Sequence, residues 1–148
     1  MPNGEGRTFF ECLMREYRYT NVDGWAHTAD IAHNFKGVDF YRDFTVVGDN
    51  IFAETAVSMK TTITKDVNTW LNSKPIKDNI DFLERALDLE EGLISNGKVM
   101  KIADVAEIHI YMPTENITDA LKIEWMNKLN TVNPKIRFEI KPLEEFIN

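Results

Sequence analysis

The chain has 148 residues, of which 43% are hydrophobic and 28% are charged, the balance of an ordinary globular domain that can bury its own core. Its single cysteine excludes an internal disulfide, and no run approaches the roughly 18 apolar residues that a membrane-spanning helix needs. The formal net charge of −7 argues against nonspecific binding to polyanions, although a cation held by carboxylates and a local basic groove are compatible with it. Because nothing in the chain needs an oxidising compartment, we expect it to act in the cytoplasm. The first residues lack the pattern of a signal peptide, so if the domain is exported, its signal lies elsewhere.

The N-terminal part of the chain predicts a tail followed by a helix. Residues 1–7 contain two glycines and no apolar periodicity, and we expect a disordered tail there. Apolar residues recur at helical spacing over 8–17, which indicates a first helix. Residues 20–33 are mixed in character, and both a short helix and an ordered loop are compatible with them.

A β-hairpin is predicted next. Apolar and polar residues alternate over 38–47, which is typical of a half-buried strand. Gly48, Asp49 and Asn50 supply a turn, and 51–63 reads as the second, antiparallel strand.

The second half of the chain alternates helices with strands. Residues 68–75 are polar and turn-rich. The elements expected after them are a helix capped by Asp78 or Asn79 and ending near Asn96, a strand over 106–112, a helix capped by Asn116 or Thr118 and running to Leu129, and a strand over 136–140. This order predicts an α/β fold in which helices cover a mixed sheet, as one domain over 8–148, with the two late strands as parallel neighbours.

Four polar side chains on the hairpin could form a centre for phosphodiester hydrolysis. That reaction needs a cation, an activated water and charge stabilisation at the leaving oxygen, which carboxylates and a lysine can provide with Mg²⁺. We expect Asp39 to lie in the middle of the first strand as a metal ligand. Glu54, Ser58 and Lys60 have the same parity and would share one face of an unbroken second strand. Lys60 would orient or activate the attacking water.

A carboxylate from the first helix could complete this centre. Glu11 lies at one edge of the apolar stripe of that helix and is preferred to Glu16 at the opposite edge. The same charges are also expected if the hairpin simply has a solvated face with cross-strand ion pairs.

Four further residues are candidates for contacts with a substrate. His33 and Asn34 precede Asp39 closely, and Lys65 and Trp70 follow the second strand. An aromatic ring stacked on a base contributes about 1–3 kcal/mol. Core filling by the tryptophan and a solvated loop around the lysine explain these residues equally well.

Two short runs carry a resemblance to a known family. His-Asn-Phe-Lys-Gly-Val-Asp-Phe at 33–40 and Ala-Val-Ser-Met-Lys-Thr-Thr at 56–62 resemble the core of PD-(D/E)xK restriction-endonuclease-like toxin domains. Within that family the chain is most similar to the C-terminal nuclease toxins of contact-dependent growth inhibition and Rhs polymorphic systems. The resemblance covers roughly residues 8–112.

The family's functional positions fall on residues already singled out. Its strand aspartate matches Asp39, its lysine matches Lys60, and its acidic-or-substituted position matches Ser58. Because Ser58 stands where the archetype has Asp or Glu, Glu54 is expected to replace the missing carboxylate as a metal ligand.

The resemblance implies both a fold and a function. The fold would be a restriction-endonuclease-like core, a mixed sheet with an antiparallel hairpin flanked by helices. The function would be cleavage of DNA or tRNA with Mg²⁺ or Mn²⁺. Such a domain is delivered into the cytoplasm of a target cell as part of a larger secreted protein, is neutralised by an immunity protein and needs no membrane partner. The alternative is a noncatalytic interaction domain of the same fold or an acidic immunity protein, which the net charge and Ser58 favour.

Overall fold

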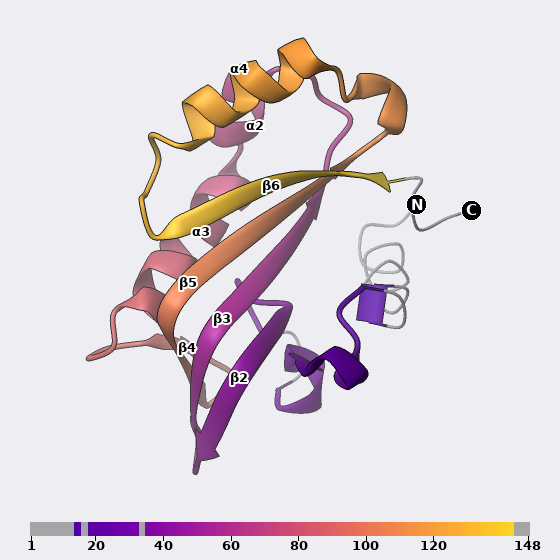
Figure 1. Cartoon of the computed structure of the whole chain (residues 1–148). Coiled ribbons are helices and arrows are strands. Elements are labelled where there is room, and N and C mark those ends of the chain that lie inside the picture. Colours follow the sequence, from indigo (N-terminus) through magenta and orange to yellow (C-terminus); the bar gives the residue numbers. More distant parts are fainter. Residues whose placement is uncertain (1–13, 16–17, 33–34, 144–148) are drawn as a thin grey trace.

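A computed structural model describes residues 14–15, 18–32 and 35–143, and this part of the chain forms a mixed sheet covered by helices (Figure 1). The six strands are β1 (Trp25–His27), β2 (Phe40–Val47), β3 (Asn50–Thr61), β4 (Leu93–Ser95), β5 (Lys98–Met112) and β6 (Ile136–Pro142). The α-helices whose bounds lie within the described residues are α2 (Val67–Asn72), α3 (Lys74–Leu87) and α4 (Asp119–Leu129), and 3₁₀ turns lie at Asn21–Asp23, Thr28–Asp30 and Thr114–Asn116. None of the helices described is long and apolar enough to cross a membrane.

The sheet is antiparallel in its first half and parallel in its second. β1, β2 and β3 pair antiparallel in chain order, and β3, β5 and β6 pair parallel. Parallel neighbours need long connections, which α2 and α3 supply between β3 and β5, and α4 between β5 and β6. The short β4 pairs antiparallel with the start of β5. The α/β class, the mixed sheet, the hairpin and the parallel pairing of the last two strands are therefore confirmed.

The sheet buries apolar residues on both faces. On one face, which we call the helix-side core, α2, α3 and α4 contribute Trp70, Leu83 and Trp125 against Ile108 and Ile110 of β5. The other face carries a smaller group, which we call the second core and which consists of Met14, Tyr19, Phe40, Val57, Met59 and Tyr111. β3 and β5 therefore lie between two layers (Figure 1).

Several predicted boundaries are confirmed. The hydroxyl of Thr118 accepts a hydrogen bond from the backbone N–H of Leu121 at 3.1 Å, so Thr118 is the N-cap of α4. The hairpin strands and β6 lie within two residues of their predicted bounds. The segment 20–33, which allowed a helix or a loop, contains the two 3₁₀ turns with β1 between them in its described part.

The prediction of one helix ending near Asn96 is wrong. α3 begins at Lys74, with Pro75 in its first turn where the missing N–H costs nothing, and it ends at Leu87. Asn96 and Gly97 both have positive φ, 50° and 79°, the backbone of a two-residue type I′ turn. They join β4 to β5, so the dipeptide that looked like a helix end is a hairpin turn.

Two other predictions need correction or lie outside the structure. The turn-rich segment over 68–75 contains helix α2, which Asp66 caps by accepting from the N–H of Asn68 at 3.1 Å. The strand predicted over 106–112 is the second half of a strand that starts at Lys98. The predicted tail over 1–7 and most of the first helix lie outside the described residues.

Gly37 allows the chain before β2 to pass close beneath α3. Its φ is +87°, and a Cβ atom placed there would lie 2.6 Å from Cβ of Phe82. Both the left-handed backbone and the contact with a helix favour glycine.

We expect Gly37→Ala to lower the free energy of unfolding by about 2 kcal/mol or more, because left-handed strain and the clash with Phe82 act together. Gly48→Ala is the matched control, since Gly48 also has positive φ but no atom within 4 Å of the added Cβ. The control should lose only about 1 kcal/mol. Urea unfolding measures both, and equal losses would contradict the close approach to α3.

Candidate active site

Asp39 lies beside the strand that carries Ser58 and Lys60. Its carboxylate Oδ2 accepts a hydrogen bond of 2.7 Å from the backbone N–H of Met59, and its own N–H donates to the carbonyl of Val57 at 2.9 Å. Because Met59 stands between Ser58 and Lys60, these bonds bring the two runs of the predicted motif together. Asp39 is not in the middle of a strand as predicted, since β2 begins one residue later. Its side chain instead accepts the bond from Met59, so hydrogen bonding to β3 extends one residue beyond the start of β2.

Ser58 is held in a buried hydrogen-bond network beneath α3. Its side chain has no exposed surface, its hydroxyl donates to the carbonyl of Gly37, and it accepts from Nδ2 of Asn79 at 3.0 Å. The same amide nitrogen lies 3.4 Å from the carbonyl of Gly37. Through these bonds Ser58 connects α3 to β3 and positions the loop at Gly37 that leads to Asp39. Lys60, two residues further on, is partly buried and pairs in register with Ile110 of β5.

The prediction that Glu54 shares one face of the strand with Ser58 and Lys60 is wrong, because the alternation of β3 is broken. Ala53 and Ala56 both pack in the helix-side core, three residues apart, whereas Val57 belongs to the second core. The register between β3 and β5 shifts at the same place, between Ala53 and Thr55. Glu54 is exposed at this irregularity. Four residues of strand also separate Glu54 from Ser58 by about 13 Å, so Glu54 lies too far from the Asp39 carboxylate, which is bonded at Met59, for both to hold one cation.

Of the four residues predicted to contact substrate, Trp70 and Lys65 lie within the described part of the chain. Trp70 is 5% exposed and packs its ring against Trp125 with centroids 5.6 Å apart, so it fills the core and offers no face to a base. Lys65 is exposed in the loop before α2. Its carbonyl accepts a hydrogen bond from Nε1 of Trp125 at 2.9 Å. Glu11, Glu16, His33 and Asn34 lie outside the described residues.

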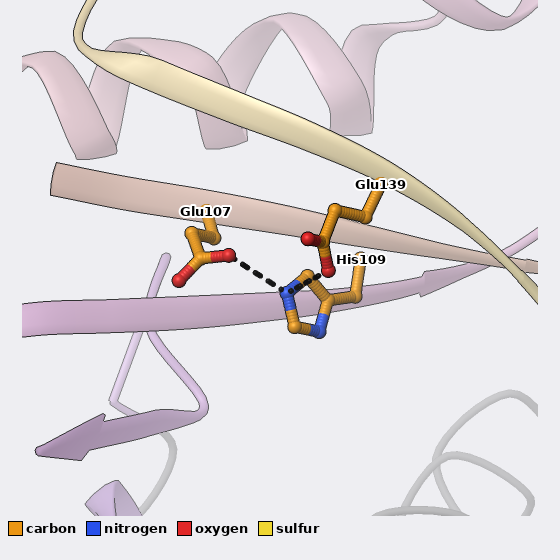
Figure 2. A group of neighbouring side chains, drawn as sticks. All are labelled: Glu107, His109 and Glu139. Carbon is orange, nitrogen blue, oxygen red and sulfur yellow. Dashed lines mark hydrogen bonds and ion pairs between the residues drawn. The ribbon is translucent and has the colours of Figure 1, made fainter.

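The structure also assembles a cluster that sequence reasoning missed. Glu107 and His109 lie two residues apart on β5, and the register partner of His109 on β6 is Glu139. Nε2 of His109 lies 3.2 Å from Oε1 of Glu107 and 3.2 Å from Oε2 of Glu139. Figure 2 shows both carboxylates turned toward this nitrogen from neighbouring strands. We call these three residues the Glu–His–Glu cluster.

Tyr19 links the Glu–His–Glu cluster to the neighbourhood of Asp39. Its hydroxyl is hydrogen-bonded to Nδ1 of His109 and lies 2.7 Å from the hydroxyl of Tyr111. Burial, reinforced by Tyr111 and by the negative charge of Asp39, raises the pKa of Tyr19 far above its ordinary value. Tyr19 therefore stays a neutral hydroxyl that can both donate and accept.

The charges around the cluster are of both signs. The hydrogen bond from His109 lowers the pKa of Glu107 against the opposing effect of burial, and the charges of Arg137 and Arg42 lower it further. Nζ of Lys141 lies 3.4 Å from Oε2 of Glu139. The alternation Glu-x-His in a strand could have suggested a pair on one face. Glu139, the third residue of the cluster, is brought to His109 only by the pairing of β5 with β6.

Comparison of the chain with protein-family models, curated proteins and solved structures finds no match. The resemblance of the two short runs to PD-(D/E)xK toxins therefore stays a prediction.

We expect Ser58→Ala and Asn79→Ala each to lower the free energy of unfolding by about 1–3 kcal/mol, because each leaves a buried polar group without its partner. The double variant should lose less than the sum, with a coupling of about 0.5–3 kcal/mol, since the two side chains share one network. Denaturant unfolding of the four proteins measures this cycle. Additive losses would show that the Ser58–Asn79 bond does not hold α3 to the sheet.

Proposed function

We propose that this protein is a metal-dependent endonuclease whose centre contains Asp39 and Lys60. The observation that carries the proposal is the hydrogen bond between the carboxylate of Asp39 and the backbone N–H of Met59, which joins the two halves of the motif. This bond places the carboxylate of Asp39 one residue from Lys60 along β3, and a carboxylate and a lysine are the parts that phosphodiester hydrolysis with a cation would need.

The residues around Asp39 supply some of the oxygen ligands that a hard divalent cation needs. A carboxylate can accept about four hydrogen or metal bonds, so the bond from Met59 orients Asp39 without preventing it from ligating Mg²⁺ or Mn²⁺. The described residues contribute one carboxylate here, and Glu11 stays the proposed second ligand. Glu54 is not part of the proposed centre, because of its exposure and its distance along β3.

The roles of the residues follow from this arrangement. When bound, the cation neutralises the phosphoryl oxygens and polarises water. Asp39 holds the cation, and Lys60 orients the attacking water or stabilises the charge that develops on the phosphate. A new bond forms between the water oxygen and phosphorus while the bond from phosphorus to the leaving oxygen breaks. Ser58 acts as a positioning residue through its bonds to Gly37 and Asn79.

A restriction-endonuclease-like core is the fold that we propose for this sheet. The antiparallel β2–β3 hairpin is followed by a parallel strand reached through helices, which agrees with what the resemblance implies. The resemblance also supplies the proposed biology of a toxin domain with DNA or tRNA as substrate and an immunity protein as partner. The net charge of −7 predicts modest affinity for nucleic acid at physiological salt.

We expect Asp39→Asn and Lys60→Gln each to reduce cleavage of plasmid DNA or tRNA at least 100-fold in Mg²⁺ or Mn²⁺, because the first removes the ligand of the cation and the second removes the group that acts on the water or the phosphate. Asp43→Asn and Glu54→Gln are the controls, since both residues are exposed carboxylates of the same hairpin. The controls should retain cleavage, and circular dichroism should show that all four variants fold. Full activity in both test variants would refute the assignment of the centre.

The second candidate function is a noncatalytic interaction domain or an acidic immunity protein. Ser58 replaces the acidic residue of the archetype and is fully engaged in structural hydrogen bonds. The tip of the hairpin also exposes apolar side chains that suit a protein partner, namely Phe44, Val46, Val47 and Phe52.

Toxicity on expression separates the two functions. An active nuclease should prevent growth of cells that express the wild-type chain, whereas Asp39→Asn should express freely because cleavage is lost. The measurement is the number of transformants under induction, with Asp43→Asn as the matched variant. Equal, unimpaired growth of all three strains would favour the noncatalytic domain.

A further inference from the structure

We infer that Glu107, His109 and Glu139 form a binding site for one divalent transition-metal ion of the Zn²⁺ class. This site is separate from the proposed Asp39 centre and does not depend on the proposed nuclease activity. Among residues 14–15, 18–32 and 35–143, these are the only three His, Cys, Asp or Glu side chains whose ligand atoms gather in this way, all within 4.8 Å of one another.

The spacing of the ligand atoms agrees with coordination of one ion. Around a tetrahedral Zn²⁺ with bonds of about 2.1 Å, neighbouring ligand atoms lie about 3.4 Å apart. Nε2 of His109 lies 3.2 Å from each of the two carboxylate oxygens. The ion would therefore lie between Nε2 and these two carboxylate oxygens, where the three side chains already face one another.

Donor chemistry selects the class of metal. One imidazole nitrogen and two carboxylate oxygens suit Zn²⁺ and similar ions, whereas Mg²⁺ prefers oxygen ligands alone. Three protein ligands leave a fourth position for water or an anionic group.

A buried second layer holds the histidine in place. The side chain of His109 is only 7% exposed, and Nδ1 contacts the hydroxyl of Tyr19. A metal-bound histidine needs an acceptor for its other ring N–H. The Tyr19 hydroxyl can accept a hydrogen bond from the Nδ1–H of His109 and at the same time donate one to the hydroxyl of Tyr111, 2.7 Å away. Access remains open at Glu139, whose side chain is 40% exposed.

Lys141 is the group that opposes an ion. Its Nζ lies 3.4 Å from Oε2 of Glu139, the same oxygen that faces His109. Its positive charge partly neutralises the carboxylate in the absence of metal. Binding therefore requires the ammonium group to move away, which its flexible stem and position at the edge strand β6 allow.

The test is zinc binding by the full-length chain in the Asp39→Asn background, which removes the proposed catalytic carboxylate. After chelator treatment, titration calorimetry with Zn²⁺ alone should give one site with a Kd of about 10 μM or tighter, and Mg²⁺ should bind at least 100-fold more weakly. Glu139→Gln should weaken zinc binding at least 10-fold, and Lys141→Gln should strengthen it. Glu124→Gln, an exposed carboxylate on α4, is the matched control and should bind as its parent does.

The gain expected from Lys141→Gln cannot arise from misfolding, so it keeps the test decisive if a loss variant is unstable. A zinc edge anomalous peak in soaked crystals, placed between Nε2 of His109 and the two carboxylates, would establish the ligands directly. Absence of zinc binding, or binding that Glu139→Gln and Lys141→Gln leave unchanged, would overturn the inference. Because cleavage is not measured, failure here is distinct from failure of the nuclease proposal.

Discussion

The parallel pairing of β3 with β5 is the constraint on which the rest of the structure depends. β5 lies at the centre of the second half of the sheet, bonded to β3 on one side and to β4 and β6 on the other. A parallel neighbour forces the chain to leave the sheet and return, so α2 and α3 must cross over one face. Strand alternation then sends Ile108 and Ile110 toward these helices and His109 and Tyr111 toward the other layer. One backbone arrangement thus creates the helix-side core on one face and, on the other, the second core with His109 beside it.

The proposed Asp39 centre and the Glu–His–Glu cluster lie next to each other in this sheet. Asp39 contacts the backbone of Met59, and Met59 is the register partner of His109. Tyr19 is hydrogen-bonded to His109 and belongs to the second core together with Met59, so this core adjoins both groups. Substitutions at Tyr19 are therefore expected to disturb two places at once, which makes single-residue effects there hard to assign without double-mutant cycles.

Local sequence patterns correctly predicted the elements whose conformation depends mainly on residues close together in the chain. The β2–β3 hairpin and the Thr118 cap of α4 follow from alternation, turn residues and a side-chain cap within a few residues of one another. Asn96 and Gly97 form a dipeptide that can either end a helix or close a hairpin, so the local sequence does not distinguish the two. The presence of β5 as a partner for β4 decides between these outcomes. The sequence likewise allows Trp70 either to stack on a base or to fill the core, and its contact with Trp125 of α4 shows that it fills the core.

By itself, the sequence determined the α/β class, the hairpin and the proximity in the chain of Ser58 to Lys60, since these depend on periodicity and short-range chemistry. Only the tertiary structure decided that Asp39 contacts β3, that Glu54 lies outside this group and that Glu139 joins His109. The reason is physical, because strand register and breaks in alternation arise from pairing between segments far apart in the chain. A one-residue change of register moves a side chain to the opposite face, and no local pattern reports it.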